Sequence, residues 1–157
     1  MKTTIRTIIL AVAAMGYAMR GMRLAANTYD AAVETHESAI LRLNAAAIAA
    51  RHLLYTQSIG DTVAVNGATD IPLGTIDNIE TAVNFRQSVL LLDKGSTKKM
   101  VANGAISAGQ RVFTAAGGKV SNVYGATLYQ VGIALSSALA DNDIIEVADS
   151  SPMKTNA

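Results

Sequence analysis

The stretch that decides the fold is residues 100–149, MVANGAISAGQRVFTAAGGKVSNVYGATLYQVGIALSSALADNDIIEVAD. Short apolar runs alternate in it with small or turn-forming residues, and these runs are Arg111–Ala115, Lys119–Val123, Tyr129–Leu135 and Ile144–Val147. Branched and aromatic side chains suit a half-buried pleated surface, whereas Gly, Asn and Asp close tight turns. The close spacing of these runs predicts a compact antiparallel β-domain.

Similar signals extend upstream. Arg51–Gln57 reads as the first strand, and Asn66-Gly67 and Gly117-Gly118 predict hairpins because both positions of each pair tolerate positive φ. We therefore place the compact β-domain at residues 51–150 and a C-terminal tail at residues 151–157.

Two segments of the β-domain resemble each other. Ile71–Ile76 carries an embedded glycine and is followed by a turn and a second apolar run, Ala82–Leu92. Gln130–Leu135 also carries a glycine and is followed by Ile144–Val147. A lone glycine within a strand often marks a bulge or a close backbone approach. The pattern predicts a small antiparallel β-barrel or sandwich of two related halves.

Residues 1–50 form, by expectation, an N-terminal helical and extended arm. Ala39–Ala50 has the alanines and leucines of a helix, but it also suits a strand, and both alternatives stay open. The apolar run Ile8–Met19 is shorter than the roughly 20 residues of a membrane span. Its basic start also permits a signal peptide, and a packed helix is the favoured alternative. A candidate protein interface lies on one helical face, and its residues are Ile5, Ile8, Ile9, Val12, Met15 and Met19. A core helix within the chain explains the same face equally well.

Composition excludes several classes of function. The formal charge of +1 combines 13 basic with 12 acidic residues, so nothing indicates a nucleic-acid or membrane partner. The absence of cysteine excludes disulfides and thiolate metal sites. Apolar residues make up 50% of the chain but aromatic residues only 4%, and alanine contributes little burial energy. A core of this kind is often completed by neighbours, which weakly favours an assembly protein.

No motif predicts catalysis. His36-Glu37 and His52 lack the spacing of a metal site. Asp141-Asn142-Asp143 lacks the downstream glycine and glutamate of a calcium loop, and a turn capped by its own side chains explains it better. Gly118-Lys119 is not preceded by the first glycine of a phosphate loop, and Lys98-Lys99 reads as a solvated hairpin edge. We therefore expect no enzyme activity, no cofactor and no metal.

An ordered series of short phrases across about residues 51–150 resembles the capsid decoration, or cement, proteins of tailed bacteriophages. The phrases are Pro72-Leu73-Gly74, Met100-Val101-Ala102, Gly104-Ala105-Ile106, Ala108-Gly109-Gln110-Arg111-Val112, Gly117-Gly118-Lys119-Val120, Val131-Gly132-Ile133-Ala134-Leu135 and Asp143-Ile144-Ile145-Glu146-Val147.

The resemblance implies a compact β-fold that binds the major capsid protein on the outside of an assembled head, often as a homo-oligomer. It also implies a virion location on the capsid exterior, after assembly in the host bacterial cytoplasm. Residues 1–50 depart from the shortest members of the family, which begin close to the first strand, and we expect this arm to dock on the capsid or on a neighbouring subunit. The alternative function is a secreted or periplasmic β-domain with a cleaved signal, acting in ligand binding or adhesion.

Overall fold

The computed structural model describes residues 39–46, 50–77, 83 and 85–156. The chain divides into two units, residues 1–37 and 38–157, and every described residue lies in the second. The described part is nearly all β-structure and contains a closed barrel, which confirms the predicted fold class. The sequence predicts an N-terminal arm at residues 1–50. Residues 1–38 of this arm, which include the candidate interface, lie outside the described residues.

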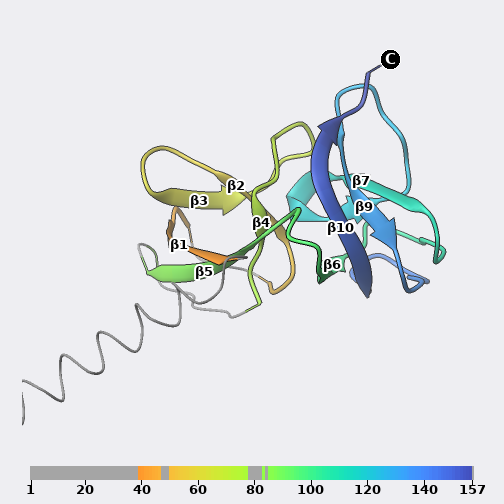
Figure 1. Cartoon of the computed structure of the whole chain (residues 1–157), viewed down its shortest axis with the longest axis horizontal. Helices are drawn as coiled ribbons and strands as arrows, with labels where there is room; N and C mark the ends of the chain where they lie inside the picture. The colour runs from red at the N-terminus through yellow and green to blue at the C-terminus, as the bar shows by residue number, and fades with distance from the viewer. Residues whose placement is uncertain (1–38, 47–49, 78–82, 84, 157) are drawn as a thin grey trace, which may run out of the picture. The chain divides into compact units, whose positions relative to one another are not determined.

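The first five strands close a barrel in the order β1-β3-β2-β4-β5. Figure 1 shows these strands in orange to green, and their bounds are β1 Ala39–Asn44, β2 Leu54–Gln57, β3 Thr62–Val65, β4 Gly74–Thr75 and β5 Arg86–Leu91. β1 runs parallel to β3 and antiparallel to β5, and the remaining barrel pairs are antiparallel. The barrel core consists of buried apolar side chains, namely Leu53, Tyr55, Val63, Ile76, Val89 and Val101.

The other five strands form an antiparallel sheet in the order β6-β10-β9-β7-β8. Their bounds are β6 Thr97–Val101, β7 Arg111–Thr114, β8 Val120–Ser121, β9 Tyr129–Ala134 and β10 Ile144–Lys154. A bridge between Ala102 and Val120 joins the two edges of this sheet, so the sheet curls. The two cores are linked because Leu54 of β2 packs into the core of the curled sheet, while Val101 of β6 packs into the barrel.

Gly74 and Gly132 occupy equivalent places in the two halves. A Cβ on Gly74 would collide with the carbonyl oxygen of Leu90 and lie 3.0 Å from Cγ1 of Val89, the residue before it. A Cβ on Gly132 would collide with the carbonyl oxygen of Ala148 and lie 2.7 Å from Cγ1 of the preceding Val147. Both glycines therefore mark a close approach of two backbones, as the embedded glycines predict. A register shift of β9 against β7 also leaves a bulge beside Gly132.

The turn at Gly117-Gly118 is confirmed. A 3₁₀ turn, η1 (Ala116–Gly118), joins β7 to β8, which pair antiparallel, and both glycines have positive φ. Asn66-Gly67 does not form the predicted hairpin. It begins the connection from β3 to β4, and these two strands both pair with β2 rather than with each other.

The β-structure extends beyond the expected boundaries of 51 and 150. Ala39–Asn44 forms a strand because five of its residues pair with β5, and this pairing outweighs the helix propensity of the segment. At the other end β10 continues to Lys154, where it pairs with Tyr129. Arg51 and His52 form a turn before β2, with His52 at a φ of 64°, so His52 is not the strand residue that we expected.

Candidate interaction surface

The outward face of the β9–β10 hairpin carries exposed aliphatic side chains. Along β10, Ile145 and Val147 point into the core, while Ile144 and Glu146 alternate with them and face outward. We define the β9–β10 surface as the exposed large apolar residues at the loop end of this hairpin, which are Ile133, Leu135, Leu139 and Ile144, whereas the exposed Met153 lies near the other end of β10. Three of them are exposed by 44% to 54%, and Leu139 by 89%.

The strand register places charged residues around this surface. Arg111 of β7 lies opposite Ile133, and Lys99 of β6 lies opposite Glu146. The N–H of Leu135 donates to the carbonyl oxygen of Glu146 at 2.7 Å, so Leu135 and Glu146 are cross-strand neighbours. An antiparallel sheet with one solvated face normally presents polar residues there. A hairpin that carries aliphatic side chains on its outward face as well as on its core face is therefore suited to contact with another macromolecule.

The loop that carries Leu139 is organised by Asp143. Oδ2 of Asp143 accepts hydrogen bonds from the N–H groups of Leu139 and Ala140, at 2.8 and 2.9 Å. These bonds, the one from Ala140 first, lower the pKa of Asp143 because they favour its carboxylate form. Asn142 adopts a left-handed φ of 71°. The expectation of a turn capped by its own side chains is confirmed.

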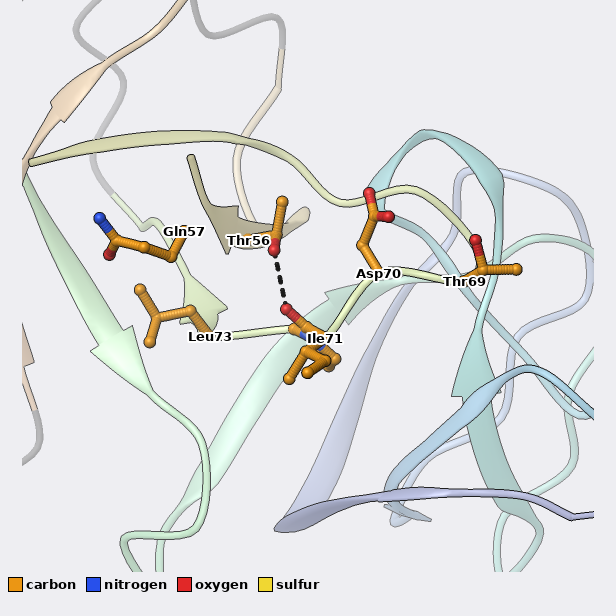
Figure 2. A pocket seen from close by; sticks show the side chains of 7 residues that line it. Thr56, Gln57, Thr69, Asp70, Ile71 and Leu73 are labelled. Carbon is orange, nitrogen blue, oxygen red and sulfur yellow. Dashed lines mark hydrogen bonds between the residues drawn. The ribbon is translucent and has the colours of Figure 1, made fainter. Parts of the chain in front are cut away.

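A hollow of about 650 Å³ lies beside the barrel loop that precedes β4 (Figure 2). Its lining is Thr56, Gln57, Thr69, Asp70, Ile71, Pro72 and Leu73. The hydroxyl of Thr56 donates to the carbonyl oxygen of Ile71 at 2.8 Å, and Oδ2 of Asp70 accepts the N–H of Gly67 at 2.9 Å (Figure 2 shows the Thr56 bond). The Thr56 hydroxyl and the Asp70 carboxylate are thus engaged in holding the loop.

A second hollow, of about 680 Å³, is lined by charged residues of the barrel and the curled sheet. His52 Nδ1 lies 2.8 Å from Asp77 Oδ1, and Lys99 and Glu146 also line the hollow. Lys98 is buried and donates to the hydroxyl of Ser96, which corrects the expectation of a solvated Lys98-Lys99 edge. The edge strand β6 thus has one inward-facing lysine, a feature that discourages edge-to-edge association.

The remaining predictions concern the N-terminal interface, the first histidine, metal binding and membrane spans. Ile5, Ile8, Ile9, Val12, Met15 and Met19, like His36 and Glu37, lie outside the described residues. Within residues 39–46, 50–77, 83 and 85–156, no cluster of three His, Asp or Glu side chains could hold a metal. Over the same ranges, no helix has the length and hydropathy to cross a membrane.

Comparisons with protein-family models and with curated protein sequences find no match to this chain.

The β9–β10 surface was not predicted from the sequence. Its signal was the run Ile133-Ala134-Leu135 followed by Ile144-Ile145, in which apolar residues occupy both alternating sets of positions. Such runs are typical of strands that are covered on both faces.

Proposed function

We propose that this protein is a viral structural protein that binds the outside of an assembled phage head and stabilises it through multivalent protein–protein contacts. The observation that carries the proposal is the β9–β10 surface, where four aliphatic side chains face solvent on one hairpin. Grouped apolar side chains on a surface favour contact with a protein. The major capsid protein is the proposed partner, and the protein itself is proposed to form a homo-oligomer on the capsid.

A comparison of the two halves supports a docking role for this surface. Leu135 follows Gly132 by three residues, as Asp77 of the barrel follows Gly74, so these two positions correspond. Ile144 precedes Ala148 by four residues, as Arg86 precedes Leu90, so these two positions correspond as well. All four residues are exposed. The same backbone arrangement thus has charged residues in one half and aliphatic residues in the other. The fold does not need aliphatic side chains at these positions, which favours a role in binding.

The proposed mechanism is the sum of many modest contacts. A subunit that touches neighbouring capsid proteins at several points gains apparent affinity without any single strong contact. Heads that lack the protein should then rupture more readily on heating than decorated heads.

Gradient sedimentation tests the proposal. The purified protein is mixed with heads that lack it, and each fraction is assayed for this chain by mass spectrometry. The comparison is the double variant L135D/I144R, which introduces the residues of the corresponding exposed barrel positions, Asp77 and Arg86. Wild-type protein should migrate with the heads in a fixed stoichiometry, and the variant should bind at least about tenfold more weakly.

Two results would count against the proposal. Wild-type protein that stays at the top of the gradient would exclude head decoration. A variant that keeps both its melting temperature and its full affinity for heads would exclude the β9–β10 surface as the contact.

A further inference from the structure

Leu139 occupies the tip of the β9–β10 surface, and its backbone is held from several directions. Besides the two bonds to Asp143, the preceding residue Ala138 exchanges two backbone hydrogen bonds with Ile106, at 2.8 and 3.0 Å. On the other side of the tip, the N–H of Asn142 donates to the carbonyl oxygen of Ala102 at 2.9 Å. Ala138 is also buried in the core of the curled sheet. An almost fully exposed leucine is therefore attached to an anchored loop.

An ion pair adds a further tie. Nζ of Lys119, between η1 and β8, lies 2.7 and 2.8 Å from the two carboxylate oxygens of Asp141. The amide group of Asn142 also donates to Oδ2 of Asp141 at 3.0 Å. The loop carboxylates thus have partners within the protein. The side chain of Leu139, in contrast, is 89% exposed to solvent.

Such an arrangement lowers the cost of binding. An apolar side chain that enters a pocket contributes most when the backbone that carries it is already ordered, because less conformational freedom is lost on association. Residues that dominate interfaces are typically central side chains in well-packed pockets. Leu139 has the exposure and the supporting contacts for such a role.

We infer that Leu139 is the anchor residue of the contact with the head, and that it inserts into an apolar socket on the outer surface of the capsid protein. This inference rests on the function proposed above. A protein socket, rather than an anionic membrane, is the occupant because the carboxylate of Asp143, which forms no ion pair with a described residue, lies within hydrogen-bond distance of the Leu139 backbone. Carboxylates are repelled by a negatively charged membrane surface.

Ile59 provides a matched control. It is exposed by 92% at the turn between β2 and β3, where its neighbours are Ser58, Gly60 and Asp61. Ile59 belongs to the barrel. No other residue of its turn is an exposed large apolar residue. Single exposed apolar residues are common on protein surfaces and do not by themselves indicate binding.

The experiment measures binding of four proteins to heads that lack the decoration protein: wild type, L139S, D143A and I59S. Wild type and I59S should bind equally. L139S should bind about 10-fold to 100-fold more weakly, because it removes the buried aliphatic side chain. D143A keeps Leu139 but releases the loop, and it should bind about threefold to tenfold more weakly. Thermal unfolding of each variant verifies that it is folded.

The outcomes separate the two proposals. If wild-type protein does not bind heads, the proposed function fails, and the anchor role fails with it. If wild type binds and folded L139S binds equally well, the anchor role is overturned while head binding stands. If I59S weakens binding as much as L139S does, the loss does not depend on the β9–β10 surface, and the inference is also overturned.

Discussion

Replacing Gly132 by alanine should destabilise the protein by about 3 kcal/mol. The new methyl group would collide with the carbonyl oxygen of Ala148 and lie 2.7 Å from Cγ1 of Val147. Both obstacles belong to β10, which pairs with β9 at Val147–Ala134 and at Asp149–Gly132, so neither can withdraw without breaking this pairing. Overpacking a core costs roughly 1–3 kcal/mol, and the upper end applies because one obstacle is backbone. For a chain of this size, the melting temperature should fall by about 10 °C.

Thermal unfolding followed by circular dichroism measures this effect, with G109A as the control. A Cβ on Gly109 would meet no atom within 4 Å, but its φ of +86° makes alanine strained. Strain of this kind costs roughly 1–2 kcal/mol. G74A should resemble G132A, because the Cβ of Gly74 would also meet a backbone carbonyl, that of Leu90. A melting temperature for G132A no lower than that of G109A would refute the close-approach argument.

Three further predictions concern ionisable groups. Burial raises the pKa of Tyr55 to about 12, and its hydroxyl has no hydrogen-bond partner among the described residues. Wild type should therefore lose stability as pH rises from the ordinary tyrosine pKa of about 10 through 12. Thermal unfolding at alkaline pH should show a smaller loss for Y55F, which should be no less stable than wild type at pH 7. The pKa of Asp143 is lowered, so loop order should persist below the ordinary aspartate range and be lost only as pH falls through the lowered pKa. NMR titration of the Asp143 carboxyl and of the Leu139 and Ala140 amides would contradict this if the amides titrate at the ordinary value. The Lys119–Asp141 pair is partly exposed, so K119M should cost under about 1 kcal/mol in urea unfolding, and 1 M salt should remove the difference from wild type.

The strands of the curled sheet could be predicted where local signals agree. The runs Arg111–Ala115 and Tyr129–Leu135 correspond to β7 and β9 within one residue at each end, because both combine branched side chains with flanking turn residues. The close approaches at Gly74 and Gly132 could also be predicted, because a glycine inside a strand usually marks a bulge or a place where another backbone comes close.

Other elements depend on distant pairing and could not be predicted. Ala39–Asn44 has a composition that a helix also accepts, and its pairing with the distant strands β3 and β5 selects the strand. The burial of Lys98 is similar. Lys98 pairs with Val147 of β10 and is buried, and nothing local distinguishes it from the exposed Lys99.

The β9–β10 surface could not be predicted because hydrophobic periodicity identifies a face only when the other face is polar. Ile144 and Ile145 are adjacent and chemically identical, yet Ile145 is fully buried and Ile144 is 54% exposed. Which of them faces the core is decided by the pairing of β10 with β6 and β9. The sequence therefore indicates a doubly apolar strand but not its outward residues.

Stability and the proposed docking role thus depend on opposite faces of the same two strands. Because side chains alternate along a strand, a slip of one residue would exchange Ile144 with Ile145 and bury the wrong set. Gly132 opposes such a slip, since no other residue fits against the Ala148 carbonyl, and the adjacent bulge also sets the register of β9 against β7. Inward substitutions should therefore reduce stability and binding together, whereas outward substitutions such as I144R should reduce binding alone. This separation allows head-binding measurements on outward variants to be interpreted without correction for unfolding.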